Sequence, residues 1–308
     1  MKLYQLELDY TNIDCGMSYV FHLNDGRFFI IDGGNCTAGE EDRLFTFLKE
    51  RSEGMPIIAG WFFSHAHDDH IGNFIQFIHM YREDVQIERL IYNFQSIDLP
   101  DEDCDWKSSG PAIVKEFYRV LDEYCSNIPV DIVNAGDIFQ IGDITVEVLF
   151  THNDFDHGDE YFNDCTTVIT TEYAEQKILW LGDVEKEGSR ILLQNKLDKL
   201  ICDIVQVSHH GFSGATKELY AATQARAALW PTPDYLMDDI KKNSSFLRDN
   251  CANLFILNDM DVKEHWVGGY GTVGITLPYK FGEVESYPKM FYGCSDIYIQ
   301  NIREQVIE

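Results

Sequence analysis

Four potential metal ligands fall within six residues of one another: His65, His67, Asp69 and His70. They follow an apolar run over residues 57–63 that is expected to form a buried strand. Two histidines two positions apart on an extended chain can face one metal ion, and Asp69 and His70 can face a second as the chain turns. Three imidazoles and two carboxylates are costly to bury without a cation. The segment therefore predicts a site for a divalent ion that prefers nitrogen and oxygen ligands.

A second apolar run, residues 178–181, ends in Gly182 and Asp183. A Gly-Asp pair alone is a common turn. Beside the histidine cluster, however, a carboxylate delivered by the end of a strand is the natural group to bridge two metal ions. Asp183 is therefore predicted to be a shared metal ligand.

A third apolar run, residues 204–207, leads to the adjacent pair His209 and His210. Neighbouring residues on extended chain point to opposite sides. One histidine is therefore expected to bind metal, while the other faces the substrate or orients a ligand. Both are candidate metal-binding residues; we favour His209 as the ligand and His210 as a catalytic group beside the substrate. Asp69 is the second candidate catalytic group, because it can accept a proton from the attacking water.

Alternating elements position these residues. A tight Asn-Asp-Gly turn predicts a β-hairpin over residues 17–32, and apolar spacing predicts helices and further strands downstream. No single parallel βαβ series covers the chain. Two sheets with helices on their outer faces fit the α/β (α+β) pattern better than one doubly wound sheet. The later predicted helices cover residues 40–53, 112–124, 189–197 and 235–248. The later predicted strands cover 90–92, 166–172, 204–207 and 254–257, and residues 139–150 are predicted to form two strands around a Gly-Asp turn.

The composition is that of one globular domain. The chain has 308 residues, of which 45% are hydrophobic, and we expect one domain over residues 1–308 with 281–308 as a C-terminal extension or closing segment. The formal net charge is −28. Duplex nucleic acid and anionic membranes are recognised mainly by cationic surfaces, so both are disfavoured as partners. A small-molecule or phosphoester substrate agrees better with this charge.

Location is predicted from what the sequence lacks. The eight cysteines include no C-x-x-C pair, which is typical of reduced thiols. The first residues alternate and carry acidic side chains, unlike a signal peptide. There is also no apolar run of about 18 residues, the length that would span a membrane. We therefore expect a cytoplasmic protein.

The cluster resembles the H-x-H-x-D-H signature of the metallo-β-lactamase superfamily, and Asp183 matches the later bridging aspartate of that family. The segments 163–168, 181–188 and 207–213 resemble one branch in particular, which includes the metallo-β-lactamase-like domain of competence DNA-uptake proteins and bacterial phosphorylcholine esterases. The resemblance implies a four-layer αββα sandwich. It also implies one or two divalent ions, with zinc expected first and manganese or iron as alternatives.

One departure from the family pattern concerns the first metal. Many members carry another metal-binding histidine upstream of the bridging aspartate, where this chain has Asn163 and Asp164. Asp164 is an alternative ligand, and His152 and His157 lie just upstream as others. One metal ion and two both remain open.

Two further residues receive weaker roles. Asp32, which precedes two glycines, matches an early aspartate of the family and is expected to support the loops of the site without binding metal. His265 lies in a glycine-rich segment that is expected to form a loop and to reach the mouth of the active site.

The resemblance favours hydrolysis of a phosphoester or phosphodiester by a metal-activated hydroxide. The alternatives are a nuclease acting on single-stranded nucleic acid, a lactone or lactam hydrolase, and a catalytically silent binding protein of the same fold. The sequence shows no Arg- or Lys-rich stretch with interleaved aromatics, which counts against the nuclease.

Overall fold

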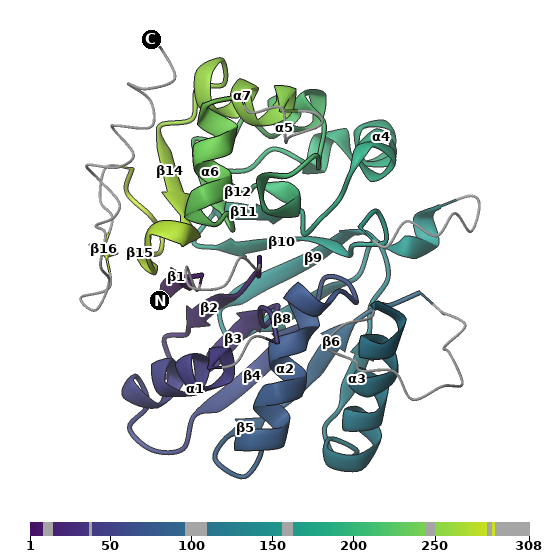
Figure 1. Cartoon of the computed structure of the whole chain (residues 1–308), viewed down its shortest axis with the longest axis vertical. Coiled ribbons are helices and arrows are strands. Elements are labelled where there is room, and N and C mark those ends of the chain that lie inside the picture. The colour runs from purple at the N-terminus through teal and green to yellow at the C-terminus, as the bar shows by residue number, and fades with distance from the viewer. Residues whose placement is uncertain are drawn as a thin grey trace.

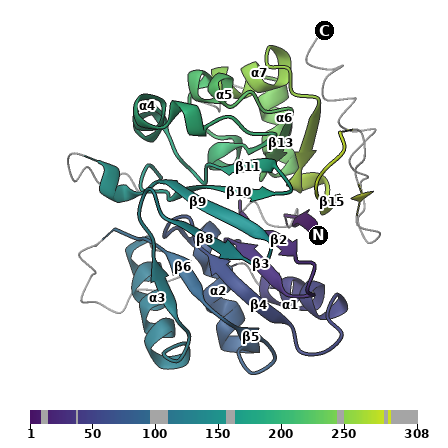
Figure 2. The same cartoon turned by 180° about the vertical axis from the view of Figure 1, so that it is seen from behind.

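Two β-sheets pack face to face, and helices cover their outer faces (Figure 1). The computed structural model describes residues 1–8, 15–36, 39–95, 110–155, 163–243, 250–281 and 285–286. Figure 2 shows the same four layers from behind. Much of the predicted C-terminal extension, namely residues 282–284 and 287–308, lies outside the described residues, as does His157.

The first sheet is mixed and contains nine strands among the described residues. β2 and β3 form the predicted hairpin, and β3, β4 and β6 then run parallel. In spatial order the strands are β16 (Glu285–Ser286), β15 (Val273–Thr276), β1 (Lys2–Gln5), β2 (Tyr19–His22), β3 (Phe28–Ile31), β4 (Ile57–Phe62), β6 (Leu90–Tyr92) and β7 (Val130–Ile132), with β5 (Gln86–Ile87) also paired to β4.

The second sheet is also mixed. Its antiparallel part is built from β8, β9 and β10, and four parallel strands complete it. In spatial order the strands are β14 (Glu264–Val267), β13 (Ala227–Trp230), β12 (Ile204–Gln206), β11 (Gln176–Trp180), β10 (Val168–Tyr173), β9 (Ile144–Phe150) and β8 (Ile138–Ile141).

Helices lie on both outer faces. Those of the first half of the chain cover the first sheet, and those of the second half cover the second sheet (Figure 1). The first group is α1 (Glu40–Glu50), α2 (Asp68–Tyr81) and α3 (Gly110–Tyr124); the second group is α4 (Lys186–Asn195), α5 (Lys217–Thr223), α6 (Asp234–Lys241) and α7 (Cys251–Asn258).

The central core lies between the sheets and is rich in aromatic side chains. Trp180 of the second sheet meets Tyr19 and Phe21 of the first, with ring centroids 4.8 and 5.9 Å apart. Two further buried apolar clusters join each sheet to its helices. Each sheet is thus apolar on both faces, which explains why β4, β11 and β12 read as continuous apolar runs in the sequence.

The carboxyl ends of β4, β11 and β12 deliver the predicted ligands, since His65, Asp183 and His209 each follow one of these strands within three residues. In open α/β sheets, ligands bind beyond the carboxyl ends of parallel strands. The two sheets bring these ends to a common edge of the sandwich, where the predicted site forms. Among the described residues, no helix combines the length and apolarity needed to cross a membrane.

Three predicted elements differ from the structure. Residues 254–257, predicted as a strand, belong to helix α7, which buries Asn253, Ile256 and Leu257 at helical spacing. The predicted helix over 235–248 ends as α6 at Lys241, and residues 244–248 of that prediction lie outside the described residues. His265 lies in strand β14 and not in a loop.

Candidate metal centre

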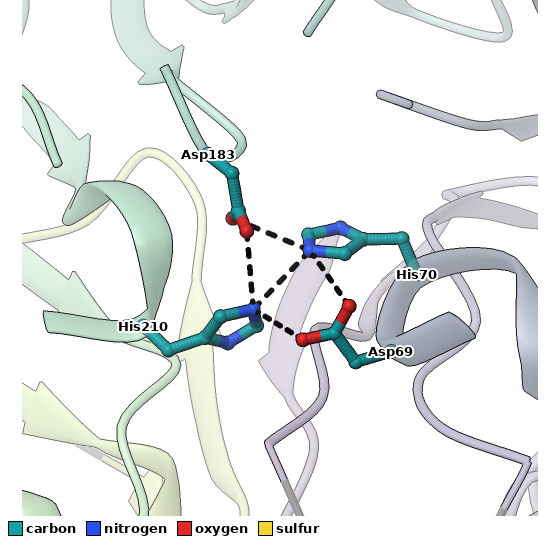
Figure 3. Close-up of side chains that lie close together, drawn as sticks. All are labelled: Asp69, His70, Asp183 and His210. Atoms are coloured by element: carbon teal, nitrogen blue, oxygen red, sulfur yellow. Dashed lines mark hydrogen bonds and ion pairs between the residues drawn. The ribbon is translucent and has the colours of Figure 1, made fainter. Parts of the chain in front are cut away.

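Four side chains from both halves of the sandwich converge on one point (Figure 3). Asp69 and His70 lie in the first turn of α2, while Asp183 and His210 follow β11 and β12. His70 Nε2 lies 3.2 Å from His210 Nε2 and 3.2 Å from Asp183 Oδ1. His210 Nε2 lies 3.1 Å from Asp69 Oδ2. We call this group of four the second metal position.

These separations fit a cation. A tetrahedral ion with ligands at about 2.0–2.1 Å separates its donor atoms by roughly 3.3 Å. The three distances of 3.1 to 3.2 Å between donor atoms have this length. Asp183 Oδ1 is also buried, and it has His70 Nε2 3.2 Å away. The donor set of two imidazoles and two carboxylates therefore suits Zn²⁺, Mn²⁺ or Fe²⁺.

His65, His67 and Asp183 form a second group, which we call the first metal position. His65 Nε2 lies 3.1 Å from His67 Nδ1 and 3.7 Å from Asp183 Oδ2. Asp183 belongs to both groups, as expected of a bridging carboxylate. Among the described histidines, cysteines and acidic residues, no fourth member joins this group. The two positions are thus unequal in protein ligands.

Buried hydrogen bonds orient His70. Its Nδ1 lies 2.8 Å from Asp32 Oδ2, so the nitrogen that faces away from the cluster donates to a carboxylate. The same carboxylate accepts hydrogen bonds from the Ser64 amide and hydroxyl, both at 2.7 Å. Asp32 is fully buried and contributes no atom to either metal position. Such a partner fixes the tautomer of a ligand histidine and raises its basicity.

Backbone constraints place Asp183. Gly182 has φ +52°, and a Cβ there would lie 2.6 Å from Thr166 Cγ2. The buried side chain of Gln206 braces the same turn, because its Oε1 accepts from the amides of Leu181 and Gly182 at 2.8 and 2.7 Å. Thr166 Oγ1 also accepts from the Asp183 amide at 3.1 Å. The backbone of Asp183 is thus fixed by protein contacts alone.

His209 and His210 occupy consecutive left-handed conformations, with φ of 50° and 52°. Such strain at non-glycine residues persists only where surrounding contacts impose it. Here the His209 amide donates to Gly182 O at 3.1 Å, and Thr232 Oγ1 donates to His210 O at 2.7 Å. His210 Nδ1 contacts Pro231 O at 3.0 Å, which leaves Nε2 for the cluster. The imidazole of His210, and not that of His209, lies in the second metal position.

The charges around the cluster shift its pKa values strongly. Burial alone would lower the pKa of His70, but Asp183, Asp32 and Asp69 raise it to about 10. Burial likewise opposes protonation of His210, yet Asp183 and Asp69 hold its pKa well above the usual value. Without metal, the surrounding carboxylates therefore favour the protonated form of both imidazoles. A divalent cation supplies the same positive charge at the same point.

His65 differs from these two histidines. Burial, and then the charge on His70, lower the pKa of His65 well below the usual value. Its Nδ1 lies 3.1 Å from Ser64 Oγ and 3.3 Å from Thr166 Oγ1, and its Nε2 faces His67. A neutral imidazole held in this way is already in the state that binds metal.

The other predicted site residues lie outside both groups. Asp164 Oδ1 accepts hydrogen bonds from the Glu185 and Gly188 amides at 2.7 and 3.0 Å, so it caps the start of α4. His152 Nε2 lies 2.9 Å from Asn93 Oδ1. His265 is fully buried, and its Nδ1 accepts a hydrogen bond from Trp230 at 3.2 Å. His265 therefore lies inside the second sheet, and not in a loop at the mouth of the site.

Sequence reasoning missed the residues that hold the ligands in place: Ser64, Thr166 and Gln206. Gln206 carries a recognisable signal, since it is the single polar residue within the apolar run 204–207. Buried polar side chains are retained where they satisfy backbone groups. Ser64 and Thr166 carry no such signal, because serine and threonine are common at the ends of strands.

The architecture and the site together decide the fold. Two mixed sheets packed face to face carry helices on both outer faces, and the cluster of candidate ligands lies at their common edge. The chain has the metallo-β-lactamase fold. The four-layer αββα sandwich predicted from the sequence is confirmed.

Comparison with known proteins adds one curated relative. The chain is similar to ComE operon protein 3 of Bacillus subtilis (strain 168), with 22% identity over 258 residues. The match covers 83% of this chain but 29% of that protein, so the chain spans less than a third of the relative's length. No family model matches the chain.

Several solved structures are similar to the chain at low sequence identity. The metallo-β-lactamase fold protein YhfI from Bacillus subtilis is 13% identical, with a TM-score of 0.47 over 80% of this chain and 94% of that chain. The short form of human tRNase Z is 11% identical, with a TM-score of 0.44 over 75% and 92%. Zn²⁺-bound PqqB from Methylobacterium extorquens is 9% identical, with a TM-score of 0.41 over 68% and 72%.

Proposed function

We propose that the chain is a metal-dependent hydrolase with two divalent ions, and that it acts on a phosphoester or phosphodiester. The observation that carries this proposal is the sharing of Asp183 by the two groups of candidate ligands. Bound ions would lower the pKa of a water molecule toward neutrality and polarise the scissile oxygen. Zinc is the expected metal, with manganese and iron as alternatives.

The candidate ligands have different roles in this proposal. His65 and His67 would hold one ion and His70 and His210 the other, and Asp183 would be shared between them. Asp69 lies against His210 and, with its side chain 20% exposed, also borders the solvent side of the cluster. It is therefore the group placed both to bind metal and to accept a proton from the attacking water. His210 binds metal in this proposal, whereas the sequence had favoured His209.

The substrate class rests on the motifs. The segments 163–168, 181–188 and 207–213 resemble the branch with competence proteins and phosphorylcholine esterases, and the curated relative is ComE operon protein 3. The net charge of −28 supports a small phosphoester over a nucleic acid. A cytoplasmic location stays a prediction.

A substrate panel tests the proposal. Metal-loaded protein is assayed with bis-p-nitrophenyl phosphate, p-nitrophenyl phosphorylcholine, a lactone and nitrocefin. We expect turnover of one or both phosphoesters. Turnover of the lactone or nitrocefin alone would replace the substrate class while keeping the hydrolase. A salt-sensitive gel shift with single-stranded DNA at micromolar protein would favour the nuclease.

Two matched variants test whether any measured activity depends on the candidate metal centre. Asp183→Asn removes the shared charge, and Asp198→Asn changes an exposed aspartate in the short turn after α4. Activity should disappear in the first variant and stay at the wild-type level in the second. Wild-type protein that binds no metal and hydrolyses none of these substrates would favour the catalytically silent binding protein instead.

A further inference from the structure

The two metal positions differ by one protein ligand. The second position has Asp69, His70, Asp183 and His210, while the first has His65, His67 and Asp183. That comparison covers histidine, cysteine and acidic side chains only. An amide oxygen is also a metal ligand in proteins. A buried amide oxygen without a hydrogen-bond donor could therefore supply the missing ligand of the first position.

Asn163 has such an oxygen, and its orientation is determined by its neighbours. His209 Nδ1 lies 3.1 Å from Ser213 O, and because a carbonyl only accepts, Nδ1 carries the proton and Nε2 carries the lone pair. Asn163 Nδ2 donates to that lone pair at 3.2 Å and to Glu185 Oε1 at 2.9 Å. Two acceptors on the same side fix the nitrogen of the amide there. Asn163 Oδ1 must point the other way.

In that orientation, the oxygen is buried and accepts no hydrogen bond from any described residue. Buried acceptors normally have a donor or a cation. Asn163 also begins the turn that packs against His65 and Asp183, since its carbonyl accepts from the Thr166 amide at 3.1 Å. Thr166 in turn touches His65 Nδ1 at 3.3 Å and the Asp183 amide at 3.1 Å.

We propose that Asn163 Oδ1 is the fourth protein ligand of the first metal position, oriented by His209 and Glu185. This inference rests on the proposed metal-dependent function. The chemical consequence is an unequal pair of sites. The first position would have the neutral amide oxygen of Asn163 where the second has the carboxylate of Asp69, so the first should hold a divalent ion less tightly than the second.

Metal stoichiometry and affinity test the proposal without any assay of activity. Ions per chain are counted by elemental analysis after dialysis, and dissociation constants come from competition with a chromogenic chelator. Wild type should bind two ions. Asn163→Ala should keep the ion of the second position and bind the other on the order of tenfold to a hundredfold more weakly. Asn163→Asp, which retains an oxygen ligand, should restore the second ion.

Three controls separate the possible results. Asn153→Ala changes another asparagine, whose Nδ2 donates to Asn134 at an exposed site, and should bind two ions as wild type does. His65→Ala defines the loss of the first position. Far-ultraviolet circular dichroism confirms that each variant is folded.

Wild-type affinity for both ions in folded Asn163→Ala would overturn the assignment of Asn163 and leave the hydrolase proposal intact. Absence of metal from the wild type would overturn the hydrolase proposal itself, and the assignment of Asn163 with it.

Discussion

Asp32 Oδ2 lies 2.8 Å from His70 Nδ1, so a buried carboxylate just after β3 holds a candidate metal ligand of α2 by its far ring nitrogen. Asp32→Asn keeps the shape but loses the charge. We expect the second metal position to bind its ion about tenfold to a hundredfold more weakly, as is typical when such a supporting partner is removed. Chelator competition measures the change.

The exposed substitution Asp198→Asn is the control for this variant. Equal affinities in Asp32→Asn and wild type would show that the carboxylate only supports the fold.

The second prediction separates the adjacent histidines. His65→Ala disables the first metal position, so this background should bind one ion at the second. Adding His210→Gln should abolish that ion, because His210 Nε2 lies within 3.2 Å of His70 Nε2 and Asp69 Oδ2. Adding His209→Gln should retain it, since the His209 ring contacts Asn163 and Ser213. Elemental analysis measures the number of metal ions per chain in both double variants. The reverse pattern would restore His209 as the ligand.

The third prediction concerns Asp164, which caps α4 through the Glu185 and Gly188 amides. Removing a capping carboxylate costs about 1–2 kcal/mol. Asp164→Ala should therefore lower the free energy of unfolding in urea by about that amount while the protein still binds its full complement of metal. Loss of an ion at unchanged stability would instead identify Asp164 as a ligand.

The fourth prediction uses pH and metal removal together. In metal-free protein, Asp183, Asp32 and Asp69 raise the pKa of His70 to about 10, against roughly 6.5 for an unfolded histidine. A raised pKa contributes stability that is complete below the unfolded value and is lost as pH rises through the folded value. The free energy of unfolding of the metal-free protein should therefore fall from about pH 7 to pH 10.

Metal-loaded protein is the matched control for this titration. Its ligand nitrogens are deprotonated by the metal, so this cause of pH dependence is absent. Urea unfolding at several pH values, with and without chelator, measures both curves. Metal-free stability that stays constant or rises up to pH 10 would contradict the proton balance described for His70.

The candidate ligands were predictable because each group follows an apolar run. A run such as 57–63 or 178–181 is long enough to identify a buried strand, and the polar residue that ends it must emerge at the edge of a sheet. Family resemblance predicted Asp32 as a supporting residue, and its carboxylate contacts His70 and Ser64. These features depend on local sequence, which the chain displays directly.

Other features depend on tertiary contacts. The run 254–257 is four residues long, and periodicity over four residues does not distinguish a strand from a buried turn of helix. The alternation expected of extended chain did not apply to His209 and His210, because both have left-handed backbones imposed by Gly182 and Thr232. Asp164 was an open alternative because nothing in the sequence shows that its carboxylate lies at the start of α4.

The pairing of β1 bears on how the protein is made. β1 lies between β2 and β15, and Lys2 is paired with both His22 and Thr276. On the ribosome, the first sheet therefore keeps one side of β1 open until Thr276 has been translated and has left the exit tunnel. Formation of the metal centre is delayed as well, because His70 is synthesised long before Asp183 and His210. Most of the chain must therefore be synthesised before the first sheet or the metal centre can be completed. Chaperones that shield β1 and α2 in the nascent chain would have their largest effect during that interval.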